Sequence, residues 1–181
     1  YDAVSNVPAG EEATIEMLQA DYYNPMSIPV EGQNKNFKIT TSKELLDQGI
    51  TSTIYYTGVE SGSGLFNMSG CTGNVAFEKV NLDGLGIERS GPLMLIEGEG
   101  LTVSLNDAVE LRNNAARDEG GAIWLSASTL ELNGAKIHDN STMDRGNGGA
   151  ISANNGSQVI VNSGEFYNNN SGGYGGAINA Y

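Results

Sequence analysis

Carboxylates are the side chains best suited to chemistry in this chain. Its 181 residues include 22 Asp and Glu against nine Lys and Arg, so the formal net charge is −13 at pH 7. Calcium ligation needs several acidic oxygens around one point, and glycosidic bond cleavage needs two carboxyl groups that face each other. The acids are instead scattered, with no Asp-x-Asp or Asp-Asp pair, as at Asp83, Asp118, Asp139 and Asp144. We therefore expect no catalytic residues and no metal site.

The other reactive side chains occur once each. His138 has no Ser or Cys nucleophile at a meaningful spacing, and we expect it at the surface beside Ile137. Cys71 excludes an internal disulfide and a zinc site built from several cysteines, so we expect a small buried hydrophobe. Neither a Gly-x-Gly-x-x-Gly run before a helix nor a P-loop lysine is present, so no cofactor is expected.

The acidic balance also limits the partners. A surface of this charge repels phosphate backbones and anionic lipid headgroups, which disfavours nucleic acid and membrane surfaces. No run approaches the roughly 18 apolar residues of a membrane helix, so no membrane insertion is expected in this segment. The length fits one domain with a single core.

An internal repeat is the strongest signal in the sequence. Gly-Gly-Ala-Ile occurs at residues 120–123, 148–151 and 175–178, at spacings of 28 and 27 residues. An apolar residue followed three positions later by Asn recurs at similar spacing, in 111–114, 137–140 and 166–169. Short alternating runs at 101–105, 129–133 and 158–162 share this period. Each repeat therefore holds three strand-like runs and no helical periodicity.

This pattern predicts an all-β fold, a right-handed parallel β-helix of about five coils with three faces, as in the pectate-lyase-like superfold. Each coil adds one strand to each of three parallel sheets, and equivalent residues of successive coils stack about 4.8 Å apart. The alternation predicts which side chains point inward on the three faces: Ile123, Leu125, Ile151, Ala153, Ile178 and Ala180; Leu130, Leu132, Val159 and Val161; Leu111, Ile137 and Phe166.

Glycine and asparagine mark the turns between these strands. A sharp entry into a strand needs a positive φ or close backbone approach, which glycine allows. Asparagine tolerates the left-handed conformation, and its amide can hydrogen-bond along the stack. We interpret these residues as structural turn ladders and not as ligands: Gly120, Gly121, Gly148, Gly149, Gly175, Gly176, Asn114, Asn140 and Asn169.

The period extends backwards with a weaker signature. Leu82 lies 29 residues before Leu111, and Leu93 and Leu65 continue the Ile123 series. We assign residues 65–181 to regular coils and 1–64 to the first coil or coils. Runs at 14–18, 26–30 and 36–40 predict the three strands of a first coil, and 42–49 predicts a short helix with Ser42 as its N-cap and Gly49 at its C-terminal end. No capping element follows the last repeat, so we expect truncation from a longer protein.

The two repeat motifs resemble those of chlamydial polymorphic membrane proteins, which are autotransported adhesins. Residues 120–140 also resemble the coils of large, cell-wall-anchored β-helical proteins of Gram-positive gut and oral bacteria, with their Gly-Gly-Ala-Ile, Thr-Leu-x-Leu-Asn-Gly and Ile-x-x-Asn runs. Both resemblances imply a secreted rod on a bacterial cell surface that acts in adhesion or host interaction. They imply no catalytic residues, a host or neighbouring-cell protein or glycan as partner, and further repeats and an anchor outside this chain.

Two alternatives stay open. Parallel β-helices include polysaccharide lyases and glycoside hydrolases, so an enzyme is the first alternative, and an inert stalk is the second.

A solenoid binds with the outward stripes of its surface, so the outward columns bear on this choice. Two columns on the third face mix charges and suit structural support: Asn81, Glu110, Lys136 and Glu165; Asp83, Arg112, His138 and Tyr167. Trp124 is expected to point outward, above Ser152 and Asn179. Such an indole either contacts a protein or a sugar, or packs under a loop.

Overall fold

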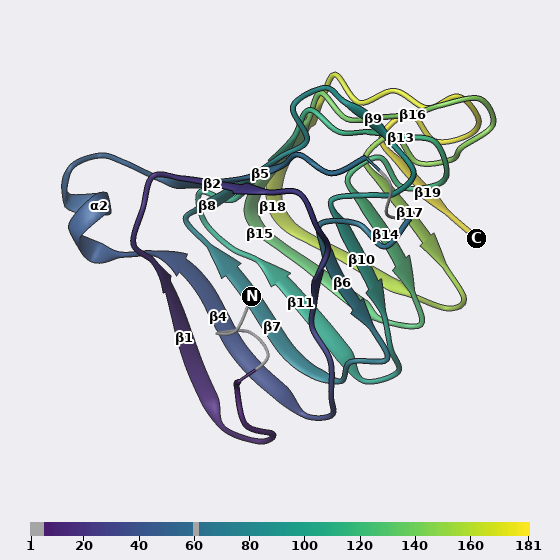
Figure 1. Ribbon diagram of the computed structural model, residues 1–181. Coiled ribbons are helices and arrows are strands. Elements are labelled where there is room, and N and C mark those ends of the chain that lie inside the picture. Colours follow the sequence, from purple (N-terminus) through teal and green to yellow (C-terminus); the bar gives the residue numbers. More distant parts are fainter. Residues whose placement is uncertain (1–5, 60–61) are drawn as a thin grey trace.

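The computed structural model describes residues 6–59 and 62–181. The chain winds into successive turns of parallel strands, from the N-terminal turn at one end of the molecule to the C-terminal turn at the other (Figure 1). The strands form a three-faced β-helix of about six turns with 3% helix, which confirms the predicted all-β, parallel β-helical fold. The sequence pattern indicated about five turns because the first three turns lack the Gly-Gly-Ala-Ile signature.

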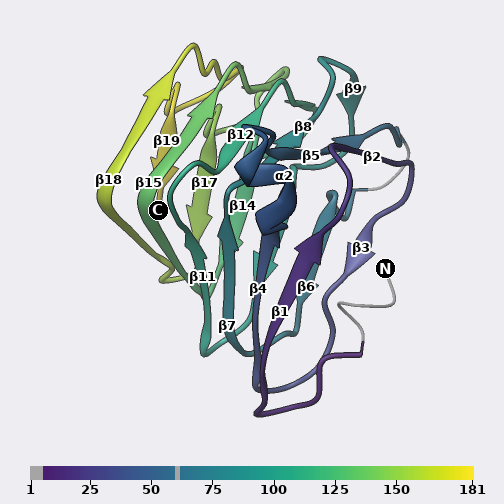
Figure 2. The same cartoon turned by 90° about the vertical axis from the view of Figure 1, so that its left-hand side faces the viewer.

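Three faces make up the solenoid, and we name each by its first strand. The β1 face contains β1 (Glu12–Met17), β4 (Lys35–Thr41), β7 (Gly73–Glu78), β11 (Leu101–Leu105) and the first halves of β15 (Thr129–His138) and β18 (Gln158–Tyr167). The β2 face contains β2 (Asp21–Asn24), β5 (Ser52–Tyr56), β8 (Val80–Asp83), β12 (Glu110–Arg112) and the second halves of β15 and β18. Figure 2 shows the strands of the β1 face side by side.

The β3 face contains β3 (Ile28–Pro29), β6 (Phe66–Ser69), β10 (Met94–Glu97), β14 (Ile123–Ser126), β17 (Ile151–Asn154) and β19 (Ile178–Ala180). Between the β2 and β3 faces the chain makes a wide corner with a small sheet of β9 (Glu88–Arg89), β13 (Ala115–Ala116) and β16 (Ser141–Thr142). This corner projects from the body of the solenoid in Figure 1, so its turns overhang the β3 face.

The core consists of the inward side chains that the alternation predicted, except in the last turn. There Val161, Ile178 and Ala180 are exposed, and Val159 and Phe166 are half-buried, because they lie at the end of the stack. Ile123 pairs with Ile151, which pairs with Ile178, and Leu111 pairs with Ile137. Burying each such side chain contributes about 1.5–3 kcal/mol. The Ile123 column continues to Met94 and Phe66 and not to Leu93 and Leu65, so the predicted backward alignment on this face was wrong by one residue.

The first turn differs from the prediction. Strand β4 pairs along its length with β1, from Glu12 with Asn36 to Met17 with Thr41, so the run at 36–40 opens the second turn. The second strand of the first turn is β2. The sequence pattern did not predict this strand because Asp-Tyr-Tyr-Asn has a turn-forming residue at each end. Helix α2 (Lys43–Asp47) follows β4 with Ser42 at its N-cap position, and it projects from the solenoid (Figure 1).

The turns show why each glycine of a pair is needed. Gly120, Gly148 and Gly175 have φ values of 71°, 68° and 66°, which side chains rarely adopt. At Gly121 a Cβ would lie 1.9 Å from the carbonyl oxygen of Gly149 in the next turn. The first glycine of the pair thus supplies the conformation, and the second allows successive turns to stack.

The asparagines form a ladder on the opposite side of the corner. The Asn114 N–H donates to Oδ1 of Asn140, and the Asn140 N–H donates to Oδ1 of Asn169, both at 3.1 Å. The left-handed conformation lies one residue before each of them, at Asn113, Asp139 and Asn168, with φ near 55°. Hydrogen bonding, and not backbone conformation, is therefore the reason for asparagine at 114, 140 and 169.

Candidate functional site

Trp124 lies on the outward side of the β3 face. Strand β14 places it in register with Leu95 on one side and Ser152 on the other. Its strand neighbours Ile123 and Leu125 point inward and are fully buried, whereas the indole is partly exposed. The outward orientation is therefore as the alternation indicated, while a role in binding stays a prediction.

A depression of about 270 Å³ lies in front of this indole. Its apolar wall consists of Trp124, Leu95 and Pro92. The remaining lining residues are three carboxylates and two small residues: Glu97, Asp118, Glu119, Gly62 and Ser90. Among the described residues that line it there is no Lys, Arg or His, so the depression is both aromatic and anionic.

Strand β10 and the corner turn before β14 place these carboxylates in one depression. Glu97 lies two residues after Leu95 in β10, and side chains two apart in a strand share a face. Asp118 and Glu119 end the corner turn and directly precede the Gly120–Gly121 pair, where the chain enters β14. Residues 97 and 118 come from successive turns of the solenoid, so carboxylates that are far apart in the sequence line one depression.

Glu119 is held in place by side chains of the following turns. Its Oε2 accepts a hydrogen bond from the Ser152 hydroxyl at 2.9 Å and from Asn154 Nδ2 at 3.3 Å. Its Oε1 accepts from Asn147 Nδ2 at 3.0 Å, and the Tyr181 hydroxyl reaches both oxygens at 3.0 and 2.9 Å. The carboxylate is thus fixed next to the indole before any ligand arrives.

These contacts decide the ionisation of Glu119. Partial burial raises its pKa, but hydrogen bonds from Tyr181, Ser152, Asn147 and Asn154 outweigh burial and leave the pKa below its usual range. Glu119 is therefore an anion at neutral pH. Ser152, which the alternation placed on an open surface, is buried beneath this carboxylate.

The two charged columns on the β2 face pair with each other and with neighbouring turns. Arg112 Nε lies 2.8 Å from Asp83 Oδ2, and Arg112 Nη1 lies 2.6 Å from Glu110 Oε2. The strand register places Glu110 beside Asn81 and Lys136, as the sequence indicated. Because Arg112 pairs with Asp83 of the preceding turn and with Glu110 of its own strand, these columns serve the solenoid and leave little charge for a ligand.

His138 is not the surface residue that the sequence suggested. Only 8% of it is exposed, because its ring stacks on Tyr167 with centroids 4.4 Å apart. Its Nδ1 lies 2.6 Å from Asp139 Oδ2, and the hydrogen bonds from His138 and Asn168 hold the pKa of Asp139 below its usual range. The next turn covers the ring, which is why its outward position does not make it accessible.

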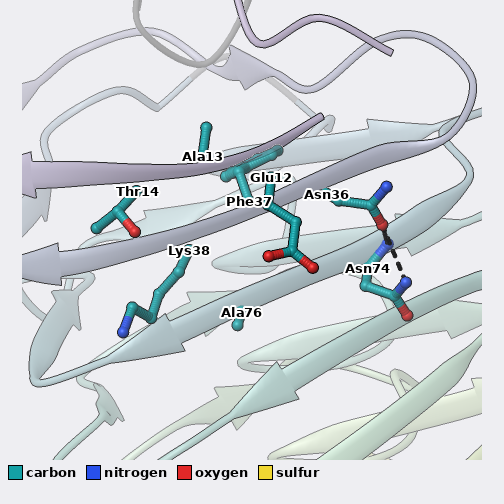
Figure 3. A pocket seen from close by; sticks show the side chains of 8 residues that line it. All are labelled: Glu12, Ala13, Thr14, Asn36, Phe37, Lys38, Asn74 and Ala76. Carbon is teal, nitrogen blue, oxygen red and sulfur yellow. Dashed lines mark hydrogen bonds between the residues drawn. The ribbon is translucent and has the colours of Figure 1, made fainter. Parts of the chain in front are cut away.

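A second depression lies on the β1 face, where the small side chain of Ala76 leaves room between larger neighbours (Figure 3). Asn36 and Asn74 flank it and are joined by a hydrogen bond of 3.0 Å, from Nδ2 of Asn74 to Oδ1 of Asn36. Lys38 points along the same surface and forms a 3.0 Å ion pair with Glu78. Asn36, Asn74 and Lys38 thus already have polar partners, and Phe37, the aromatic ring of this lining, is 5% exposed.

Other reactive groups give no site. Cys71 is fully buried, and burial raises the pKa of its thiol, so it packs as a small hydrophobe. Within residues 6–59 and 62–181, no group of three His, Cys, Asp or Glu side chains is arranged to hold a metal ion. No helix in the described part of the chain is long and apolar enough to cross a membrane.

Comparison with known proteins adds no relative. No protein-family model, no curated protein and no solved structure matches this chain.

Proposed function

We propose that this chain is a non-catalytic, ligand-binding segment of an extracellular adhesin on a bacterial cell surface, and that the depression at Trp124 is its contact site. One observation carries the proposal: the single tryptophan of the chain is partly exposed in a depression lined by carboxylates. Tryptophan is the residue most enriched at binding hot spots, because it offers a large rigid surface. The repeat motifs that resemble those of bacterial adhesins support the same role.

The rigid solenoid supports this role because it fixes the site before binding. Trp124 belongs to a strand that pairs on both sides, and Glu119 is held by four side chains. A contact surface that is already ordered loses little conformational entropy when a partner binds. A few side chains can therefore supply the affinity, although the charged groups of the β2 face pair with one another.

A polysaccharide-active enzyme is the second candidate, because Glu97, Asp118 and Glu119 converge beside an aromatic ring. Glycoside hydrolysis needs one carboxylic acid that keeps its proton near neutral pH, and this requires a raised pKa. The pKa of Glu119 is lowered, which opposes a general-acid role for it. We therefore place binding before catalysis.

Two measurements test the proposed function. The purified chain should release no unsaturated or reducing sugar from pectin, alginate or glycosaminoglycans, with or without calcium, and release of sugar would support the enzyme instead. Full-length protein displayed on cells should promote attachment to host or neighbouring cells, and antibodies against this segment should reduce it.

Single substitutions then locate the contact. Trp124→Ala should reduce attachment strongly, since loss of a hot-spot tryptophan costs on the order of 2 kcal/mol. The matched control is Tyr167→Ala, which removes another exposed aromatic ring from the β2 face. If attachment is unchanged by the antibodies and by Trp124→Ala, the segment is a spacer and the proposal is wrong.

A further inference from the structure

We infer that the depression at Trp124 takes a basic side chain, a lysine or an arginine, of a cationic protein partner. This inference rests on the proposed binding role and names the ligand chemistry for the same site. The indole would form the face against which the cation lies, and the carboxylates of Glu97, Asp118 and Glu119 would neutralise its charge.

Charge is the first argument. Three carboxylates line the depression, and none of the lining residues that the structure describes is a cation. The side chains of Glu97 and Asp118 form no hydrogen bond or ion pair with any other described residue. Elsewhere on the solenoid, Glu78 pairs with Lys38 and Lys79. Arg117 and Arg145 line an adjoining depression with Asp118 and Glu119. Within the described part of the chain, however, neither arginine forms an ion pair with these acids, so the carboxylates beside Trp124 have no paired cation.

The hydrogen-bonding character is the second argument. A carboxylate only accepts hydrogen bonds when ionised, and an ammonium or guanidinium group only donates them. A sugar hydroxyl needs donors as well as acceptors for a full set of bonds, and in this depression three carboxylates stand against two side-chain donors, the hydroxyl of Ser90 and the indole N–H of Trp124. An acceptor-rich lining therefore fits a basic side chain better than a glycan.

Shape is the third argument. A cation gains most from a tryptophan ring among the aromatic side chains, and the methylene stem of lysine or arginine packs on apolar surface while its head stays polar. Trp124, Leu95 and Pro92 supply such a surface next to the acids. The volume of about 270 Å³ is below the roughly 300–1,000 Å³ of sites for larger small molecules. It therefore suits one side chain rather than an oligosaccharide.

The net charge of the whole chain also favours a basic partner. A net charge of −13 attracts a basic partner over a distance and speeds its encounter, an effect that falls as salt rises. A general attraction of this kind would act on every acidic part of the surface. The experiment must therefore separate binding at Trp124 from attraction to the chain as a whole.

Intrinsic fluorescence makes this separation, because Trp124 is the only tryptophan. The full chain is titrated with end-blocked tetralysine and tetra-arginine, with tetralysine acetylated on every side chain as the uncharged match, and with cellotetraose and chitotetraose as neutral sugars. We expect saturable changes in tryptophan emission with the two cationic peptides, and none with the acetylated peptide or the sugars.

Variants locate the binding. Glu97→Gln combined with Asp118→Asn should weaken peptide binding at least tenfold. The control, Glu16→Gln combined with Glu44→Gln, removes the same charge from exposed positions on the β1 face and in α2 and should change binding less than twofold. Far-UV circular dichroism and urea midpoints show whether each variant folds as the wild type does.

Each contrary result has its own meaning. Equal weakening by the site and control pairs would show general attraction and overturn the inference. Saturable binding of a neutral sugar without binding of the cationic peptides would also overturn it, while the adhesive role of Trp124 would stand. Peptide binding at the site together with attachment that is unaffected by Trp124→Ala would instead contradict the proposed function.

Discussion

Replacing Asn140 with alanine removes the central rung of the asparagine ladder. Asn140 is fully buried, and its Nδ2 donates to the carbonyl oxygens of Leu111 at 3.0 Å and His138 at 2.9 Å. Its Oδ1 accepts from the N–H of Asn114 at 3.1 Å. A buried group that loses its partner costs about 1–3 kcal/mol. Asn140→Ala removes the partner of two carbonyl oxygens and one N–H, and some of these groups can bind water or another partner instead. We therefore expect the free energy of unfolding to fall by about 2–4 kcal/mol in total.

Urea denaturation followed by far-UV circular dichroism measures this loss. With an m value of about 2 kcal/mol/M, the midpoint should fall by about 1–2 M. The matched control is Asn162→Ala, because Asn162 is exposed and donates a single side-chain hydrogen bond, to Asn133 at 2.8 Å. We expect the control to stay within about 0.5 kcal/mol of the wild type. Equal midpoints for the two variants would refute the view that buried amides hold the corner together.

Three other perturbations test the core, the glycine turn and the site. Ile151→Asp should cost several kcal/mol in urea titrations because it puts a carboxylate among buried apolar side chains, whereas Thr102→Asp on the outward side of β11 should be tolerated. Gly121→Ala should lower the thermal midpoint strongly because of the 1.9 Å approach to the next turn, and Gly62→Ala, with nothing within 4 Å of its Cβ position, should not. The lowered pKa of Glu119 stabilises the folded chain above the unfolded pKa of about 4.3, and this stability is lost as the pH falls through the folded pKa. Glu119→Gln should therefore flatten the pH dependence of the free energy of unfolding in that range. An unchanged pH dependence would argue against these hydrogen bonds.

Much of the fold follows from the repeat because a solenoid converts a sequence period into contacts between neighbours. Once Gly120, Gly148 and Gly175 are aligned, the pairs Ile123 with Ile151 and Leu111 with Ile137 follow from counting residues. The first three turns lack these markers, and the second turn contains the excursion that holds α2, so counting assigned 36–40 to the wrong turn. Where the repeat is regular, alternation is enough to predict the core.

The site at Trp124 can be predicted from the sequence only in part. Alternation indicates that Trp124 points outward, since Ile123 and Leu125 must face the core. It does not place Glu119, because that residue lies in a corner turn whose path depends on hydrogen bonds to later turns. Nor does it show that Tyr167 covers His138, since an outward position in a column says nothing about how two rings stack. The sequence period therefore does not predict the side-chain contacts between turns.

Quenching of Trp124 fluorescence by caesium and by iodide tests the central claim most directly, that an accessible indole lies among ionised carboxylates. Both quenchers are compared at one ionic strength and normalised to their effect on N-acetyltryptophanamide. Since the carboxylates attract cations and repel anions, caesium should quench Trp124 better than iodide, and the difference should shrink in the Glu97→Gln, Asp118→Asn variant. Iodide that quenches as well as caesium, or an indole that neither ion reaches, would contradict the account.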